Sequence, residues 1–451
     1  MEENNLIKRL LGFLDASPVN FLAARNIADS LAAAGYRHLD PREPLGEVKA
    51  GDKFYVTKND SSVYAFHIGR KPMADAGFHI ICAHCDSPTF RIKPNAEMRS
   101  EGGIVKLNTE VYGGPIMSTW FDRPLTVAGR VILRGEYALS PRTCFVHARR
   151  PLLQISNLAI HFNRQVNDGV KLSKQKDMLP LLGIVSDTLG QRASAHDEAE
   201  GQGLLMRVIC EELAVGPDDI LDFDLYLADA TAACTFGAND EFISSGRLDD
   251  LSMCHAGLEA MLATPTTDAT KVLAIFDNEE TGSQTKQGAA SPFLAMMLQR
   301  ICASQDDACK PGERSGLEAF CQAVERAFMI SADNAHAWHP NYGEKYDPTN
   351  HPLLGGGPVI KFNAAQKYAS DAVSAAIFAE ICREAQVPCQ RFVNHSDVAG
   401  GSTLGNILAS SLPMRGVDMG NPILAMHSCR ETGAVADHIY CVKAFTTFFS
   451  K

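Results

Sequence analysis

The sequence predicts an α/β fold in which a domain built on a mixed β-sheet is interrupted by a β-rich insert. Apolar runs of six or seven residues alternate with helical segments near the start of the chain and again from about residue 236 onward, a pattern typical of α/β layers. Between these parts the pattern changes to the alternating residues of half-buried strands. We therefore predict one discontinuous α/β domain of residues 1–91 and 235–451 and an inserted domain of residues 92–234.

The composition indicates a cytoplasmic protein of more than one domain. The chain has 451 residues, of which 45% are hydrophobic, enough to bury a substantial core. Its net charge of −11 argues against nucleic acid or an anionic membrane as the main partner. No run approaches the roughly 20 apolar residues of a membrane span, and the N-terminus lacks the apolar stretch of a signal peptide. The thirteen cysteines are irregularly spaced, as expected for reduced thiols.

The first part of the chain carries clear local signals. Residues 18–34 are predicted to form a helix that starts after Ser17 and ends at Gly35. Residues 54–69 are predicted to form a hairpin.

The insert contains two predicted strands and a long connector. Residues 124–133 place Leu and Val on part of one face, and residues 153–162 are a further strand candidate. The polar stretch of residues 186–203 is expected to be a mobile loop.

Four apolar runs of the α/β domain are predicted strands, and each is followed by side chains that can bind a metal. The runs are residues 78–84, 271–276, 326–331 and 422–427. The polar groups that follow them are His84 and Asp86, then Asp277, Glu279 and Glu280, then Asp333 and His336, and finally His427. A single carboxylate after a strand is more often a turn or a helix cap. Four such endings together favour a common site, because ligands bind beyond the carboxyl ends of strands in open α/β sheets.

The stretch "HIICAHCDSP" contains both a Cys-x-x-Cys pair and a His-x-Asp pair. In an extended strand, residues two apart share a face and residues three apart do not. Cys82 and Cys85 are therefore expected to be packing residues on opposite faces. His84 and Asp86 are expected to be the chemical pair, with Asp86 accepting one ring N–H while the other nitrogen binds metal.

Two helix starts are also of interest. In "GRLDDLSMCH", Asp250 is expected to cap a helix, whereas Asp249 is a candidate to bridge two cations. The glycine-rich stretch of residues 399–407 lacks the Lys-Ser/Thr ending of a phosphate loop and is expected to be a helix start that binds a carboxylate or orients the backbone.

Over nearly its whole length the sequence resembles the M18 metallopeptidases, the aspartyl aminopeptidase family. The matching stretches occur in order: "FLDASPVNFLAARNIADSLAAAGY", "VTKNDSSVYAF", "AHCDSP", "VYGGPIMSTWFDRPL", "GRLDDL", "DNEETGS", "SADNAHAWHPNY", "HSDVAGGSTLGNI" and "AMHSCRE". The resemblance implies an aminopeptidase with two divalent metal ions, Zn²⁺ in the first place, with Mn²⁺ or Co²⁺ as alternatives.

The resemblance also implies roles for individual residues. The implied metal ligands are His84, Asp249, Glu280, Asp333 and His427, with Asp249 as the bridge. Glu279 would be the general base and Asp86 the orienting carboxylate. The positions that the family associates with substrate are His161, His336, Lys361 and Tyr368. Lys361 is our candidate for the cation that recognises an acidic N-terminal residue.

The implied partners are peptides with a free N-terminus and further copies of the chain. The family implies dodecamers in which the insert acts in dimerisation and covers the active site. Two alternatives remain open: a dinuclear carboxypeptidase or deacylase with the same metal centre, and a non-catalytic peptide-binding scaffold of the same fold. A thiol-redox protein is the weakest alternative.

Overall fold

The computed structural model describes residues 2–185, 203–306 and 316–451, and the predicted mobile connector therefore lies almost wholly outside the described residues. The chain divides into two compact units. The first comprises residues 1–86, 233–426 and 431–451, and the second comprises residues 87–232 and 427–430.

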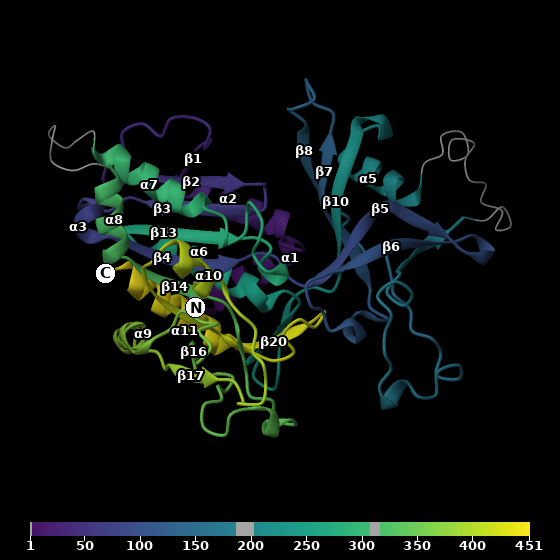
Figure 1. Cartoon of the computed structure of the whole chain (residues 1–451). Coiled ribbons are helices and arrows are strands. Elements are labelled where there is room, and N and C mark those ends of the chain that lie inside the picture. The colour runs from purple at the N-terminus through teal and green to yellow at the C-terminus, as the bar shows by residue number, and fades with distance from the viewer. Residues whose placement is uncertain (1, 186–202, 307–315) are drawn as a thin grey trace. The chain divides into compact units, whose positions relative to one another are not determined.

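The first unit is built on a nine-stranded mixed sheet (Figure 1). In spatial order its strands are β1 (Arg37–His38), β2 (Lys53–Lys58), β3 (Ser62–His67), β13 (Thr270–Phe276), β4 (Phe78–His84), β14 (Phe328–Ala332), β18 (Arg415–Gly420), β16 (Val359–Phe362) and β17 (Gln390–Val393). The central strands β13, β4, β14 and β18 run parallel, while β3 pairs antiparallel with β13 and β16 with β18. Their carboxyl ends therefore meet at one edge of the sheet.

Helices cover both faces of this sheet, and each face has its own apolar core. One core includes residues from α1 (Glu2–Ala16), α2 (Asn20–Ala33), α6 (Leu248–Ala263), α9 (Ala372–Glu384) and α11 (Val435–Phe449). The other includes residues from α3 (Met73–Ala76), α7 (Phe293–Asp306), α8 (Gly316–Arg326) and α10 (Leu404–Ser411). Cys85 belongs to the first core and Cys82 to the second, so the two cysteines lie on opposite sides of the sheet, as expected.

Two small sheets and two short 3₁₀ helices complete the described part of this unit. The strands β11 (Cys234–Phe236), β12 (Phe242–Ser245) and β20 (Glu431–Ala434) form one sheet, and β15 (Ala335–His336) pairs with β19 (Pro422–Ile423). The 3₁₀ helices are η6 (Glu279–Thr281) and η7 (Gly343–Lys345).

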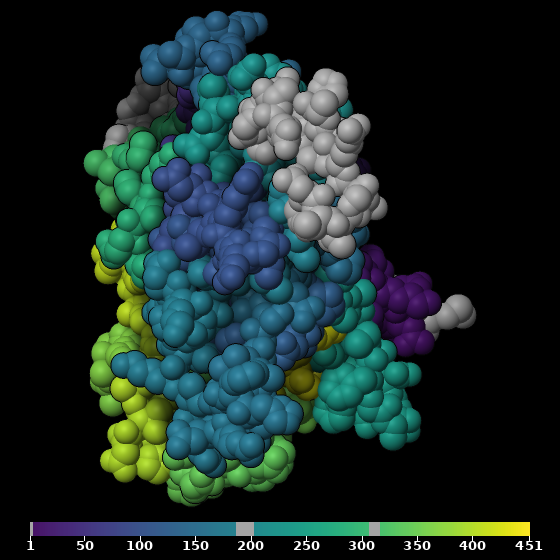
Figure 2. All heavy atoms as spheres, turned by 90° about the vertical axis from the view of Figure 1, so that its right-hand side faces the viewer, coloured from purple at the N-terminus to yellow at the C-terminus, as the bar shows by residue number. Residues whose placement is uncertain are grey.

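The second unit is a six-stranded antiparallel sheet with one described α-helix. Its strands in order are β8 (Arg142–His147), β7 (Leu125–Leu133), β10 (Ile220–Asp229), β5 (Thr89–Arg99), β6 (Ile104–Tyr112) and β9 (Leu181–Ile184). The helices are α5 (Leu204–Leu213) and the short 3₁₀ turns η1 (Glu101–Gly103), η2 (Met117–Trp120), η3 (Val166–Asp168) and η5 (Pro217–Asp219). Figure 2 draws the atoms of this unit as spheres coloured blue to teal.

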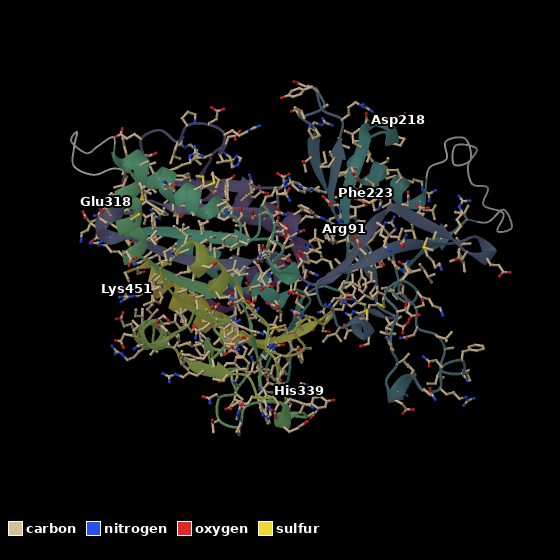
Figure 3. All side chains as sticks on the ribbon, viewed as in Figure 1. Arg91, Asp218, Phe223, Glu318, His339 and Lys451 are labelled. Carbon is tan, nitrogen blue, oxygen red and sulfur yellow. The ribbon has the colours of Figure 1, made fainter. Side chains whose placement is uncertain are left out.

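Ion pairs hold the second unit's strands and its returning segment together. Asp224 of β10 accepts hydrogen bonds from Arg91 at 2.7 Å and from Arg130 at 2.8 Å; Figure 3 labels Arg91. Asp229, at the end of β10, accepts from Arg430 at 3.1 Å. The last contact explains why residues 427–430 belong to this unit although the chain on either side belongs to the first.

Two predicted strands are wrong in extent. Residues 153–162 make only isolated bridges at Leu153, Gln154 and Ile155, after which the backbone turns away where Asn157 bonds to Asp122. Residues 422–427 contribute only the two-residue strand β19, because the backbone turns with positive φ at Ala425 and His427.

Among the helices that the structure describes, none combines the length and the hydrophobicity that crossing a bilayer requires.

Candidate metal centre

Three neighbouring parallel strands of the first unit bring polar side chains to one edge of the sheet. β4 ends at His84, β13 leads into the turn η6 with Glu279 and Glu280, and β14 is followed by Asp333. Because β4 lies between β13 and β14 in the sheet, the three strand ends are adjacent. This edge is where α/β sheets bind their ligands.

His84 is fixed by the residue two positions after it. The imidazole is buried, and its Nδ1 lies 3.0 Å from the carbonyl oxygen and 3.3 Å from Oδ1 of Asp86. Nδ1 is thus the donor, which leaves Nε2 as the nitrogen available to a metal, and Nε2 lies 3.8 Å from Oδ1 of Asp249. Burial opposes charge on the ring, but the hydrogen bond to Asp86 and the nearby carboxylates raise the pKa of His84 well above its usual value.

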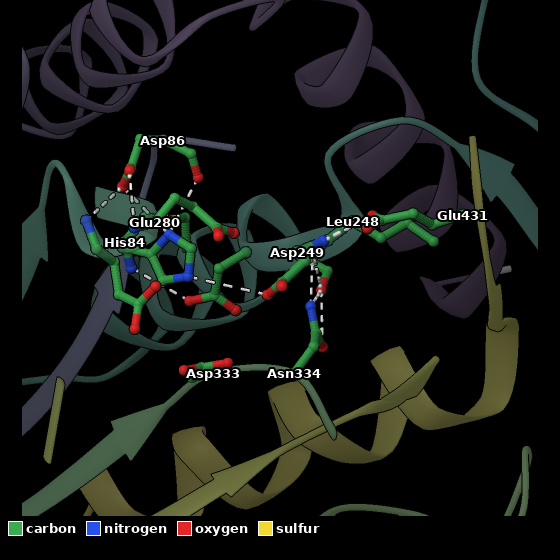
Figure 4. A network of polar contacts seen from close by, with 12 residues as sticks. His84, Asp86, Leu248, Asp249, Glu280, Asp333, Asn334 and Glu431 are labelled. Carbon is green, nitrogen blue, oxygen red and sulfur yellow. Dashed lines mark hydrogen bonds and ion pairs between the residues drawn. The ribbon is translucent and has the colours of Figure 1, made fainter. Parts of the chain in front are cut away.

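Asp86 has a second function that its position in the sequence did not reveal. Its Oδ1 accepts the backbone N–H of Glu279 and its Oδ2 that of Glu280, each at 3.1 Å (Figure 4). Asp86 therefore fixes the turn after β13 as well as the imidazole after β4.

Asp249 and Asp250 stand at the start of α6, joined by a cis peptide bond. The prediction that Asp250 caps this helix is wrong. Its side chain is fully buried, and its Oδ2 accepts the backbone N–H of His84 at 3.1 Å, because the backbone at both aspartates is not yet helical. Asp250 thus ties the start of α6 to the end of β4.

The donor atoms of this edge suit a divalent cation. Ligand atoms of His84, Asp249 and Asp250 lie within 4.8 Å of one another, as do those of His84, Glu279 and Glu280. Imidazole with carboxylates is a donor set that Zn²⁺ accepts readily. Burial, reinforced by the charges of Asp333, Glu280 and Asp86 against the opposing effect of His84, raises the pKa of Glu279 to about 9. A cation in their midst would offset this crowding of negative charge, so the residues fit the metal.

Asp333 pairs with the lysine that the sequence singled out. Lys361 on β16 is buried, and its ammonium lies 3.2 Å from Oδ1 of Asp333 and 3.0 Å from the carbonyl oxygen of Asn334. The same ammonium lies 5.6 Å from the centre of the Tyr368 ring. Burial works against its charge, but Asp333 and the other neighbouring anions raise the pKa of Lys361 above its usual value. The lysine is an ammonium at neutral pH.

Three further histidines were predicted to take part in the site. His336 is exposed on β15, with its ring centre 6.0 Å from that of Phe392. His161 is exposed in a turn of the second unit. His427 also belongs to the second unit, where its Nδ1 lies 3.2 Å from the carbonyl oxygen of Gly114. The roles of these three histidines remain predictions.

The predicted helix start after residue 399 already holds a carboxylate of the protein itself. Asp418 of β18 is fully buried and accepts a hydrogen bond from Thr403 Oγ1 at 2.6 Å, just before α10. A Cβ at Gly405 would lie 2.3 Å from Asp418 Oδ2, so only glycine allows this approach. Asp277, which also followed a predicted strand, is buried and bonded to Asn20 at 3.0 Å.

Two buried residues that contact the start of α6 were missed by sequence reasoning. Glu431 accepts the backbone N–H of Asp249 at 3.0 Å, and Asn334 donates to the carbonyl oxygen of Leu248 at 2.7 Å. Each lies in a quoted motif next to a more conspicuous residue, but no local pattern marks a side chain that acts on a backbone group far along the chain.

Comparisons with known proteins show which family the chain is similar to. Residues 13–449 match the family model described as aminopeptidase I zinc metalloprotease (M18). The chain is 49% identical over 448 residues to a probable M18 family aminopeptidase 2 of Clostridium acetobutylicum, covering 99% of both chains. It is similar to a chain in the cryo-EM structure of the Ape4 and Nbr1 complex, with a TM-score of 0.92, 35% identity, and coverage of 100% of this chain and 86% of that one. It shares its fold with the S. cerevisiae mApe1 dodecamer, with a TM-score of 0.83, 23% identity, and coverage of 99% and 97%. The chain belongs to the M18 family of zinc metallo-aminopeptidases.

Proposed function

We propose that this aminopeptidase removes acidic N-terminal residues from peptides with the help of two divalent cations, Zn²⁺ in the first place. The observation that carries the proposal is that His84 belongs to two overlapping clusters of ligand atoms, one with Asp249 and one with Glu279 and Glu280. A dinuclear centre needs donor groups for two cations close to each other.

The proposed ligands are His84, Asp249, Glu280, Asp333 and His427, with Asp249 as the bridge. The first four lie at adjacent strand ends or at the start of α6 in one unit, which supports their assignment. His427 is assigned from its motif. Mn²⁺ and Co²⁺ suit the same donors.

Bound divalent cations lower the pKa of water and stabilise the oxyanion that forms when a peptide carbonyl is attacked. Glu279 would take a proton from the attacking water and deliver it to the leaving amine. Asp86 supports this role by holding the Glu279 backbone amide.

We assign recognition of the acidic side chain to Lys361. A carboxylate taken out of water needs a cation, and Lys361 is a buried ammonium. Its partner Asp333 is a proposed metal ligand and would share its negative charge with the metal, leaving positive charge for a substrate. We keep Tyr368, His336 and His161 as substrate contacts.

We further propose assembly into a dodecamer, as in the mApe1 structure named above. In the second unit, apolar side chains on both sides of His161 are exposed: Leu158 is 60% accessible, Ile160 48% and Phe162 80%. Exposed apolar groups gathered in this way are typical of protein interfaces. They support the proposal that this unit acts in dimerisation and covers the active site.

The test is kcat/KM for peptides that differ only in their N-terminal residue, measured on enzyme of known zinc content. We expect Asp and Glu to exceed Leu and Ala, and acetylation of the N-terminus to abolish cleavage. Equal values for all four residues would remove the acidic preference. Cleavage of N-acetylated peptides would favour the carboxypeptidase or deacylase, and a zinc-loaded protein without hydrolysis would favour the scaffold.

A further inference from the structure

The peptide group that joins Leu248 to Asp249 is held at both of its ends. Its carbonyl oxygen accepts a hydrogen bond from Asn334 Nδ2 at 2.7 Å, and its N–H donates to Glu431 Oε2 at 3.0 Å (Figure 4). Asn334 and Glu431 are each only 2% exposed. Because a peptide group is a rigid plane, two hydrogen bonds at opposite ends fix its orientation, and with it the direction in which the Asp249 side chain leaves the backbone.

The local backbone does not fix this orientation by itself. Asp249 has φ −82° and ψ 108°, outside the helical range, although it stands in the first turn of α6. N–H groups in the first turn of a helix have no partner within the helix. The side chains of Glu431 and Asn334 therefore provide the hydrogen bonds that fix this peptide group.

Both side chains are themselves well anchored. Glu431 begins β20 and pairs in register with Ser245 of β12, the strand that leads into α6. Asn334 also donates to Ser252 Oγ at 3.0 Å, one turn into α6. Glu431 belongs to the three-stranded sheet and Asn334 follows β14 of the nine-stranded sheet, so the peptide is held from two separate elements.

We propose that Glu431 and Asn334 are positioning residues that aim the Asp249 carboxylate and thereby set the affinity of the site for a divalent cation. This inference rests on the proposed function, in which Asp249 is a metal ligand. Neither ligand cluster of the first unit includes Glu431, so this carboxylate acts through the amide of Asp249 and not on the cation.

The experiment is a zinc titration of the metal-free, full-length protein against a chromophoric chelator, which yields a Kd without any activity measurement. We expect Glu431→Leu and Asn334→Ala each to raise the zinc Kd about 10–100-fold, the range seen for residues that orient metal ligands. Glu431→Gln keeps an oxygen that accepts the Asp249 N–H, and we expect it to recover most of the affinity.

The matched control is Asp437→Leu. Asp437 is also a fully buried carboxylate that accepts two backbone N–H groups, those of Gly355 and Gly357, each at 2.8 Å. We expect this variant to lower the unfolding temperature of the metal-free protein, as Glu431→Leu does, but to leave the zinc Kd unchanged. A Kd raised equally in both variants would show a general structural effect and overturn the inference.

Asp249→Asn separates the inference from the function beneath it. If Asp249→Asn binds zinc as tightly as the wild type, the proposed ligand set fails. If Asp249→Asn weakens binding while Glu431→Leu and Asn334→Ala bind like the wild type, the positioning role is overturned and the ligand set stands. Should Glu431→Leu not fold, Asn334→Ala and Glu431→Gln still test the positioning role. Wild-type zinc affinity in Asn334→Ala would contradict it. A loss of zinc affinity in Glu431→Gln as large as in Asp249→Asn would also contradict it.

Discussion

Asp86 binds the backbone of Glu279, 193 residues further along the chain, with Oδ1 3.1 Å from the amide nitrogen. Through its carbonyl oxygen Asp86 also lies 3.0 Å from Nδ1 of His84. A proposed metal ligand and the proposed general base are thus held by one residue, although His84 ends β4 and Glu279 lies in η6 after β13.

We expect Asp86→Ala to lower both zinc affinity and kcat by about 10–100-fold. The substitution removes the carboxylate that accepts two backbone N–H groups and that lies beside Nδ1 of the His84 imidazole. Asp86→Asn keeps one oxygen and should lose less. Zinc content after dialysis and kcat on an Asp-peptide analogue measure the two effects. Unchanged kcat in a fully loaded Asp86→Ala enzyme would contradict the role.

Glu279→Gln should retain zinc and lose about 10²–10⁴ in kcat, since general acid–base catalysis contributes that much. The neighbouring Glu280→Gln is the control, because it should lose zinc first. Metal analysis beside steady-state kinetics distinguishes the two variants. Near-normal turnover in zinc-loaded Glu279→Gln would remove Glu279 as the base.

Lys361→Met should reduce the preference for Asp over Leu at the substrate N-terminus by about 10–100-fold, the value of a hydrogen bond to a charged group. The measurement is the ratio of kcat/KM values for the two substrates, which cancels any common loss caused by disturbing Asp333. If both kcat/KM values fall by the same factor, Lys361 pairs with Asp333 but does not recognise the acidic side chain of the substrate.

A buried histidine pair predicts how stability depends on pH. His255 Nδ1 lies 3.0 Å from His438 Nε2 between α6 and α11, with Glu259 3.5 Å from His255 and in turn paired with Arg9 at 2.7 Å. Burial, aided by the charge of Arg9, lowers the pKa of His255 to about 3. Burial, aided by His255, lowers the pKa of His438 well below its usual value. The folded protein keeps both rings neutral.

Below about pH 6.5 the unfolded chain therefore takes up protons that the folded chain does not. The free energy of unfolding consequently falls as the pH is lowered. Each ring should cost about 1.4 kcal/mol between pH 7.5 and pH 5.5. Urea unfolding at pH 7.5 and 5.5 measures the change, and His438→Gln should remove about 1.4 kcal/mol of the loss. His38→Gln, at an exposed position, is the control. A His438→Gln variant whose stability changes between the two pH values as much as that of the wild type would contradict the neutral pair.

Much of the fold follows from local sequence signals. The predicted helix over residues 18–34 is α2, the hairpin over residues 54–69 is β2 with β3, and the run at residues 78–84 is β4. Long or strongly apolar segments are predictable because their burial and their periodicity agree. The run at residues 422–427 misled, because Pro422 and Ile423 are buried in a small sheet while the main sheet uses β18 just before them.

The part of the site that lies at the ends of predicted strands could be predicted from the sequence. His84, Glu279 and Asp333 follow apolar runs, so their convergence could be expected from the sheet alone. Glu431 and Asn334 could not be found in this way, because they act on the backbone of residues 248 and 249, and such contacts depend on tertiary structure. Asp250 was misjudged for the same reason, since a capping aspartate and a buried one look alike in sequence.

Zinc titration of the metal-free wild type and of Asp249→Asn, with bound zinc per chain and peptide hydrolysis read from the same samples, tests the central claim most directly. We predict that hydrolysis by the wild type rises in step with bound zinc, and that Asp249→Asn loses both. Metal-free wild type that cleaves peptides as fast as the zinc-loaded enzyme would contradict the account.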